Sequence, residues 1–159
     1  MNSNFNPETI KKIHRNKKKL EKKLKVKLEI KGENIEIAGK ELNIFIAEKV
    51  LEAINRNFPV YIALLLADEN YVLENIQIKS IRNKNIKHIK ARIIGTKGET
   101  LKLLSELSSC HITLNENTVS IIGKAEKIKE LTTAIASLIR GSKQANVYFY
   151  LEKQRKKFV

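Results

Sequence analysis

An internal repeat with a spacing of 84 residues constrains the fold of this 159-residue chain more than any other feature of its sequence. When the chain is shifted by that length, Gly39-Lys40 falls on Gly123-Lys124 without a gap. The apolar positions on both sides keep the same frame: Leu28 with Ile112, Ile30 with Leu114, Ile35 with Val119, Ile37 with Ile121, Ile44 with Ile128 and Leu51 with Ile135. A spacing kept over so many positions indicates one supersecondary unit used twice.

Each copy predicts a hairpin followed by a helix. Short stretches of alternating apolar residues predict strands. They lie at 28–30 and 35–37 in the first copy and at 112–114 and 119–122 in the second. After each hairpin, from Lys40 or Lys124 onward, apolar residues recur at helical spacing.

The segments ahead of the two hairpins differ. In the second copy we expect two short helices over 85–94 and 99–107, with a strand over 72–81 before them. In the first copy Asn6-Pro7 is typical of a helix start, with Asn as the cap and Pro at the first helical position. Only about Ser3 to Phe5 then remains for a leading strand. The repeated unit is predicted as strand-helix-helix-strand-strand-helix, with its strands in one sheet and its helices on one face.

The joint between the two short helices of the second copy is Gly95-Thr96-Lys97-Gly98. A Walker-type phosphate loop needs four residues between its glycines and a following Lys-Ser/Thr, and a dinucleotide-binding turn needs a third glycine. Neither pattern is present. A G-x-x-G joint between two helices of this unit is instead the signature of a KH domain.

The predicted fold is therefore α+β, with two tandem type I KH folds, each a three-stranded antiparallel sheet with helices on one face. We expect a degenerate KH domain without the glycine loop, a connecting helix, a KH domain with the loop, and a basic C-terminal helix. Their predicted ranges are 1–57, 58–71, 72–143 and 144–159.

Two glycines without Cβ atoms would let a sugar-phosphate backbone approach the main chain of the joint closely. The next helix would turn its N-terminal N–H groups and its positive dipole end toward phosphate. The alternative is an ordinary glycine turn between helices. The residues predicted to bind RNA are Lys87, Lys90, Arg92, Ile94, Gly95, Thr96, Lys97, Gly98, Leu101, Lys102 and Ile112.

The first copy has no glycine before Gly32, and the 84-residue shift places Lys11 and His14 where the loop glycines stand. We therefore expect no comparable backbone approach there. Ten Lys and Arg residues lie between Glu8 and Lys27, against two Glu. They form either a diffuse phosphate-binding face or a solvated helix surface.

The formal net charge is +14, from 31 Lys and Arg against 17 Asp and Glu, which favours a polyanionic partner such as RNA. A Lys-, Ile- and Asn-rich composition is the alternative source of that charge. Cys110 is the single cysteine and no secretory signal is apparent, so we expect a cytoplasmic protein. The three histidines are scattered, and adjacent Cys110 and His111 would face opposite sides of a strand. We expect no catalytic set, metal site or cofactor, and hence no enzyme.

Four segments carry a family resemblance: IKARIIGTKGET (89–100), TVSIIG (118–123), LIRGSKQANVYFYLEKQRKK (138–157) and, more loosely, AEKVLEAINRNF (47–58). They resemble the archaeal KH-domain protein of small-subunit ribosome assembly, whose eukaryotic counterpart is the pre-rRNA processing factor of the Dim/Pno, or "partner of Nob", type.

The resemblance implies tandem KH domains that bind single-stranded RNA near the 3′ end of small-subunit rRNA and assist its 3′-end processing. It implies Gly95–Gly98 as the RNA-gripping loop and 92–94 as its supporting helix end. Its implied protein partners are the Nob-type endonuclease and the alpha subunit of archaeal translation initiation factor two. Two alternatives stay open: a protein-docking adaptor of a ribonucleoprotein complex, and the KH subunit of an RNA-degrading complex.

Overall fold

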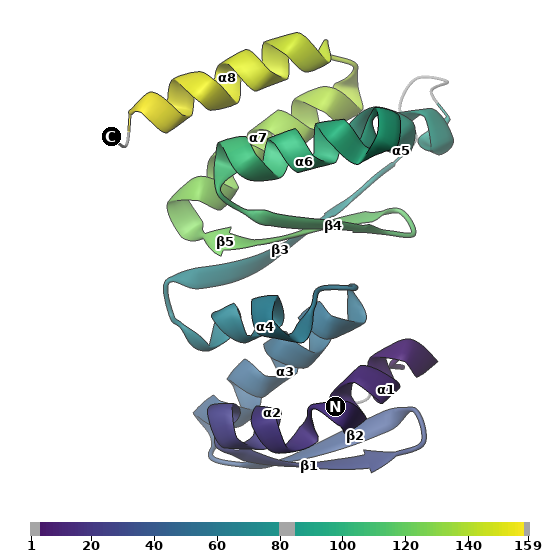
Figure 1. The fold of residues 1–159 in the computed structure, drawn as a ribbon, viewed down its shortest axis with the longest axis vertical. Coiled ribbons are helices and arrows are strands. Elements are labelled where there is room, and N and C mark those ends of the chain that lie inside the picture. Colours follow the sequence, from purple (N-terminus) through teal and green to yellow (C-terminus); the bar gives the residue numbers. More distant parts are fainter. Residues whose placement is uncertain (1–3, 80–84, 158–159) are drawn as a thin grey trace. The chain divides into compact units, whose positions relative to one another are not determined.

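The computed structural model describes residues 4–79 and 85–157, which form two units that divide between Leu73 and Glu74 (Figure 1). Each unit combines helices with an antiparallel sheet, as the sequence predicts. None of the described helices is long and apolar enough to span a membrane.

The first unit contains a helix pair, a hairpin and a longer helix. Its elements are α1 (Pro7–Arg15), α2 (Lys17–Leu24), β1 (Val26–Lys31), β2 (Asn34–Gly39), α3 (Glu41–Asn55), α4 (Val60–Ala63) and the 3-10 helix η1 (Leu64–Ala67). The helices α1 to α3 cover one face of the hairpin (Figure 1). That face buries Val26, Leu28 and Ile35, while the residues between them in β1 are exposed. Period-two alternation therefore sets which side of the hairpin meets the helices.

The start of α1 follows the predicted cap. The Asn6 Oδ1 accepts hydrogen bonds from the Thr9 N–H at 2.8 Å and from the Thr9 hydroxyl at 2.9 Å, and Pro7 is the first helical residue. The Asn6 N–H donates to Asn55 Oδ1 at 3.1 Å, which ties the entry of α1 to the end of α3. The predicted helix start is confirmed.

The prediction of a three-stranded sheet is wrong for the described part of the first unit, which has only the two strands β1 and β2. Asn4 and Phe5 form no strand, and Ser3 lies outside the described residues. A single backbone bond, from the Phe5 N–H to the Glu33 carbonyl at 3.4 Å, lies where a ladder would begin. Because the capped helix α1 begins at Pro7, the ladder cannot continue past this point of the chain.

The second unit has the full predicted order. Its elements are β3 (Tyr71–Gln77), α5 (Ile86–Ile94), the 3-10 turn η2 (Thr96–Gly98), α6 (Glu99–Ser108), β4 (His111–Asn115), β5 (Thr118–Lys124), α7 (Ala125–Arg140) and α8 (Gln144–Lys156). The strand order is β3-β5-β4, and β4 pairs antiparallel with β5. β3 is antiparallel to β5 as well, because Asn75 bonds the Ser120 hydroxyl while Ile78 bonds the earlier Asn117. Residues 80 and 81, the end of the predicted strand, lie outside the described residues.

The helices α5, α6 and α7 cover one face of this sheet, and α8 packs on α6 and α7 on the side away from the strands (Figure 1). The core between sheet and helices is apolar and closed to solvent. It contains Ile89, Ile93, Leu104, Val119, Ile121, Ile128, Leu131, Ile135 and Leu138.

The two Gly-Lys pairs of the repeat have a packing reason. Gly39 lies opposite Val26 in the first hairpin, and a Cβ on Gly39 would lie 3.3 Å from Val26 Cγ1. A Cβ on Gly123 would lie only 2.5 Å from the Sγ of Cys110, the residue that corresponds to Val26 under the 84-residue shift. Each glycine thus makes room for a side chain that enters the core at the start of the hairpin.

Burial raises the pKa of the Cys110 thiol to about 11, and its side chain is 2% exposed. The thiol therefore stays protonated at neutral pH and acts as a small apolar group.

We predict that Gly123→Ala lowers the free energy of unfolding by about 1 to 3 kcal/mol, because the new methyl group overpacks the Cys110 sulfur. Denaturant unfolding of the full chain measures this loss. Adding Cys110→Ala removes the sulfur. The double variant should therefore lose less free energy of unfolding than the two single variants lose together. Strictly additive losses would show that the contact is not what excludes a side chain at position 123.

Candidate nucleic-acid interface

The joint between α5 and α6 is a turn held largely in left-handed backbone geometry. Gly95 has φ 75°, Lys97 φ 55° and Gly98 φ 75°, so three of the joint's four residues have positive φ. Two hydrogen bonds brace the turn: the Gly98 N–H donates to the Gly95 carbonyl at 3.2 Å, and the Glu99 N–H donates to the Thr96 carbonyl. This geometry leaves the Thr96 and Lys97 side chains exposed at the tip of the joint.

The two glycines of the joint differ in their surroundings. A Cβ on Gly95 would lie 2.2 Å from Thr100 Oγ1 and 2.8 Å from the Thr100 nitrogen, so the chain itself already fills the space beside Gly95. A Cβ on Gly98 would meet nothing within 4 Å. The expectation that both glycines leave the main chain open is therefore wrong for Gly95 and correct for Gly98.

Thr100 connects the joint to the C-terminal helix α8. Its side chain is buried, and its Oγ1 accepts hydrogen bonds from the Tyr148 hydroxyl at 2.9 Å and from Gln144 Nε2 at 3.2 Å. Gln144 Nε2 also donates to the Arg92 carbonyl at 3.0 Å, near the end of α5. One helix thus holds the chain on both sides of the glycine turn.

The sequence analysis did not place these three residues in the site. Gln144 and Tyr148 stand four apart, on one face of α8, and that spacing was a usable signal. Nothing in the sequence indicates Thr100 as their common partner.

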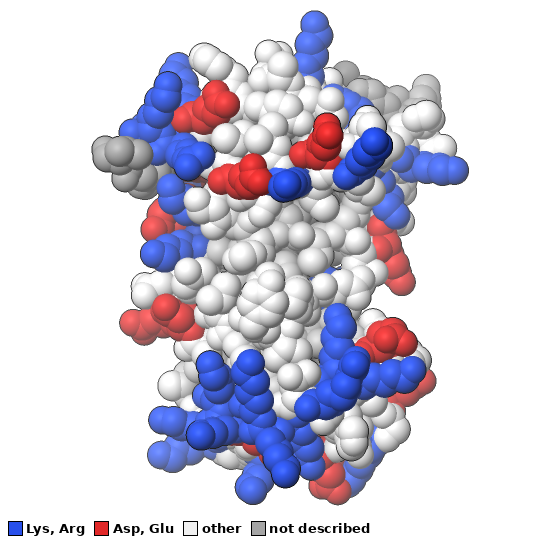
Figure 2. All heavy atoms as spheres, in the orientation of Figure 1, with Lys and Arg blue, Asp and Glu red and all other residues white. Residues whose placement is uncertain are grey.

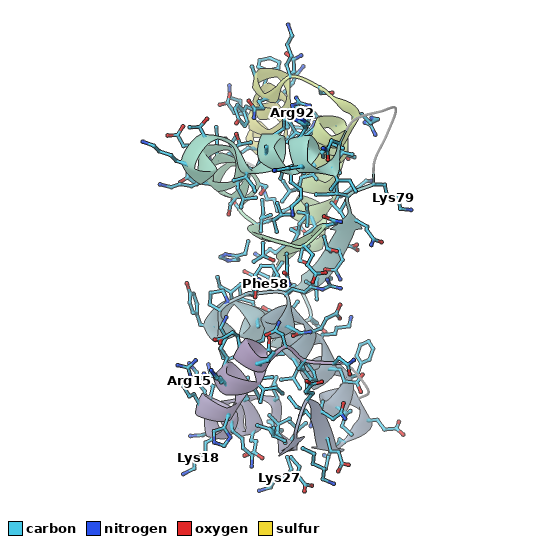
Figure 3. All side chains as sticks on the ribbon, turned by 90° about the vertical axis from the view of Figure 1, so that its right-hand side faces the viewer. Arg15, Lys18, Lys27, Phe58, Lys79 and Arg92 are labelled. Carbon is cyan, nitrogen blue, oxygen red and sulfur yellow. The ribbon has the colours of Figure 1, made fainter. Side chains whose placement is uncertain are left out.

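Arg92, predicted to contact phosphate, is directed inward instead and lies among the helices of the second unit (Figure 3). Its Nη1 donates to the Leu138 carbonyl at 3.1 Å, and its Nη2 donates to the Ser142 carbonyl. These bonds hold carbonyl groups at and just beyond the end of α7, and the Leu138 carbonyl also accepts from the Gly141 N–H at 3.1 Å. The structure places Arg92 in the support of the joint and not among its free cations, which corrects the prediction for this residue.

The remaining predicted lysines are available to a ligand. Lys87, Lys97 and Lys102 are exposed, and Lys90 is half-buried. Among the residues that the structure describes, none of these four forms an ion pair. Their charge is therefore not neutralised within the unit.

A groove of about 490 Å³ lies along α5. It is lined by Ile86, Lys87, Lys90, Ala91 and Ile94 of α5 together with Asn117 in the turn after β4. The structure thus brings three of the predicted residues, Lys87, Lys90 and Ile94, into one groove that ends at the glycine turn. Leu101 and Ile112 are half-buried and do not line this groove.

The first unit has no comparable turn. A single residue, Asn16, separates α1 from α2, with φ −109° and its Nδ2 donating to the Lys12 carbonyl at 2.8 Å. The hairpins and long helices of the two units keep the 84-residue spacing, but α1 and α5 end at Arg15 and Ile94, only 79 residues apart. The 84-residue shift therefore does not extend to this joint: Lys11 and His14 lie within α1, and the joint of the first unit is the single residue Asn16.

Basic side chains gather on the first unit, in the lower half of Figure 2. Arg15, Lys18 and Lys27 lie on its surface (Figure 3). A shallow hollow of about 490 Å³ between the end of α2 and the hairpin includes Lys18, Lys22, Lys25 and Lys27 in its lining. Phosphate binding by this face stays a prediction, with a solvated helix surface as its alternative.

In the described part of the chain, no group of three or more His, Cys, Asp or Glu residues could hold a metal ion.

The order of elements, the antiparallel sheet and the G-x-x-G turn define a KH domain of type I. The family model of the eukaryotic-type KH domain (KH-domain type I), in its form for the second domain of PNO1, matches residues 72–156. The match spans more than half of the chain, which therefore belongs to the PNO1/Dim2 type of KH-domain proteins, as the sequence resemblance predicted.

Curated relatives agree with this assignment. A KH domain-containing protein of Methanocaldococcus jannaschii is 34% identical over 149 residues, which cover 89% of this chain and 66% of that protein. The pre-rRNA-processing protein PNO1 of Coccidioides immitis is 29% identical over 136 residues, 79% of this chain and 53% of that protein. The chain thus spans between about half and two thirds of the length of these two relatives.

Two solved structures from Pyrococcus horikoshii OT3 are similar over almost the whole chain. The crystal structure of Dim2p is 30% identical with a TM-score of 0.82, covering 95% of this chain and 96% of that one. The match in the crystal structure of the a/eIF2alpha–aDim2p–rRNA complex is 31% identical with a TM-score of 0.86, covering 98% of this chain and 93% of that one.

We predict that alanine is tolerated far better at position 98 than at position 95. Gly98→Ala adds only left-handed backbone strain, about 1 to 2 kcal/mol. Gly95→Ala adds at least as much strain, because φ 75° with ψ 175° is a conformation that essentially only glycine adopts. The new side chain also collides with Thr100, which costs about 1 to 3 kcal/mol more. Denaturant unfolding of the two full-length variants compares these losses, and equal losses would contradict the assignment of Gly95 to internal packing.

Proposed function

We propose that this protein binds single-stranded RNA through its second unit, near the 3′ end of small-subunit rRNA, and assists the processing of that end. The observation that carries the proposal is the open main chain at Gly98, set between exposed, unpaired lysines at the end of the α5 groove. Because no catalytic group is needed for this role, we propose a binding protein and not an enzyme.

The chemistry of the joint suits phosphate. With no side chain at Gly98, a sugar-phosphate backbone can lie against the peptide groups at the start of α6. That helix end carries the positive end of the helix dipole. Lys97 adds a flexible ammonium group, and Thr96 adds a hydroxyl donor.

The groove suits unstacked bases. Ile86 and Ile94 give it apolar surface, while Lys87 and Lys90 add positive charge. Single strands bind where bases rest on apolar or aromatic surface and phosphates meet basic groups. A KH grip extends over about four nucleotides. In an RNA duplex the bases would be paired and closed to such a groove.

The similar proteins support the nature of the RNA and of the partners. The Pyrococcus aDim2p occurs in a complex with rRNA and a/eIF2alpha, and the Coccidioides relative is a pre-rRNA-processing protein. By extension we propose small-subunit rRNA as the RNA and the alpha subunit of translation initiation factor two as a protein partner. The Nob-type endonuclease is proposed as the enzyme that this protein assists.

We further propose that the KH domain with the loop comprises 72–143, with 144–159 as its added basic helix. The segment 1–57 is then a degenerate KH domain, and 58–71 connects the two. A protein-docking adaptor is the second candidate function, favoured by two exposed apolar side chains on α3. Leu42 and Phe45 are 68% and 55% exposed. Large apolar side chains exposed to water can be buried against a protein partner.

We predict that Thr96→Asp with Lys97→Asp abolishes RNA binding without unfolding the chain, because both side chains are exposed and the new carboxylates repel phosphate. The matched control is Lys129→Asp with Thr133→Asp, which makes the same change of charge on exposed positions of α7. Fluorescence anisotropy with a single-stranded RNA of the small-subunit rRNA 3′ end measures binding. The loop variant should lose at least about 100-fold in affinity, since the reversed charge at position 97 and the new negative charge at position 96 together remove roughly 3 kcal/mol or more of charged contact. Equal affinities of loop variant and control would favour the adaptor.

Salt dependence separates the two basic surfaces. A grip on about four nucleotides should give a log–log slope of affinity against salt of roughly −2 to −3 for single-stranded RNA. Binding is titrated at several salt concentrations with the wild-type chain and with Lys18→Glu/Lys22→Glu. If the wild-type slope is steeper than this range and the slope of the double variant lies within it, the first unit also contacts phosphates.

A further inference from the structure

A second hollow, of about 510 Å³, lies in the second unit between the glycine turn and α8. Residues of α5, the turn, α6 and α8 all line it. The lining includes His88, Thr96, Glu99, Thr100, Gln144 and Tyr148. We call this hollow the rear pocket, because the α5 groove lies on the other side of α5.

The rear pocket continues the α5 groove around the end of a helix. Ala91 lines both hollows, so they adjoin each other at that level of α5. Gly95 and Thr96 of the turn also line the rear pocket. A single-stranded RNA that follows the α5 groove and crosses the glycine turn therefore reaches the rear pocket next.

The inner wall of the rear pocket is fixed in place. The Tyr148 hydroxyl and Gln144 Nε2 both bond Thr100 Oγ1, so the Tyr148 ring is held in position at the wall. A preset aromatic ring offers a stacking surface to a base at little ordering cost.

The outer wall carries two groups with free hydrogen-bonding capacity. Glu99 and His88 are exposed, and neither has a hydrogen-bond or ionic partner among the described residues. The carboxylate of Glu99 repels phosphate but accepts hydrogen bonds from base amino groups, as Glu does from the N4 amino group of cytosine. The pocket chemistry thus favours a base and disfavours a phosphate.

We infer that the rear pocket is a binding subsite for one nucleobase of the RNA strand, beyond the nucleotides held in the α5 groove, and that Glu99 selects a base that carries an amino group. The inference rests on the proposed RNA-binding function. Cytosine, adenine and guanine each present an amino donor. Uracil has no amino group, and its one base-edge donor, N3–H, lies between two carbonyl oxygens that a carboxylate repels. Uracil is therefore the base that the carboxylate rejects.

Selection from a random pool of eight-nucleotide single-stranded RNAs, followed by sequencing, tests the inference with the full chain. The wild type should enrich a motif with one added position, next to the groove motif, at which uracil is disfavoured about tenfold or more. In Glu99→Gln this rejection of uracil should disappear while the groove positions keep their preferences, because a glutamine amide can serve either kind of base edge. The overall affinity is not the readout, since removal of a negative charge raises it.

Glu106→Gln is the matched control, since this exposed carboxylate stands two turns further along α6 and does not line the pocket. It should behave as the wild type does. Tyr148→Ala should weaken the added position for all bases, because it removes the stacking ring, and thermal unfolding reports whether the variant is folded. A wild-type motif confined to the groove, or an added position unchanged in Glu99→Gln, would overturn the inference and leave the proposed function standing. Enrichment of no RNA by the wild type would overturn both.

Discussion

The contact between Thr100 and the bare main chain of Gly95 is the constraint on which the candidate interface depends. It brings the first turn of α6 against the end of α5, closer than any side chain at position 95 would allow. Tyr148 and Gln144 hold the same threonine from α8, and Gln144 also holds the carbonyl of Arg92. Since Arg92 in turn binds carbonyl groups at the end of α7, four helices share one small set of polar contacts. These hydrogen bonds hold both helices that flank the turn, so the main chain that Gly98 offers is positioned before a ligand binds.

A second close contact between a glycine and a side chain occurs in the hairpin of each unit. In each hairpin a glycine near the end of the second strand lies beside a residue at the start of the hairpin, Val26 as the first residue of β1 and Cys110 directly before β4. Side chain and glycine share one volume, so a change at either position must be matched at the other. This pairing explains why the glycine persists in both copies although the rest of the apolar series varies in size.

The sequence predicted the strands, the long helices, the cap at Asn6 and the glycine turn, because each of these has a local pattern in the chain. It failed where the outcome depended on a distant partner. In the sequence Arg92 does not differ from the other basic residues. Only the fold brings it to the carbonyl groups of Leu138 and Ser142, which lie 46 and 50 residues further along the chain. The sequence likewise does not distinguish Thr100 from other threonines, because its partners Gln144 and Tyr148 come from the distant helix α8. In the described part of the first unit a third strand is absent, since the capped start of α1 turns the chain into a helix two residues after Phe5.

The one-residue joint at Asn16 serves as an internal control for the glycine turn. The same scaffold, with a helix pair packed on a hairpin and a long helix, folds in the first unit with no left-handed residue between α1 and α2. Helix pairing in this architecture therefore does not require the positive φ angles of Gly95, Lys97 and Gly98. The first unit has no such strained residue at its joint. In the second unit the positive φ of Lys97 alone lowers the free energy of unfolding by about 1 kcal/mol or more. The strained turn has no counterpart in the described part of the first unit, and it coincides with the open main chain that we propose as the RNA contact.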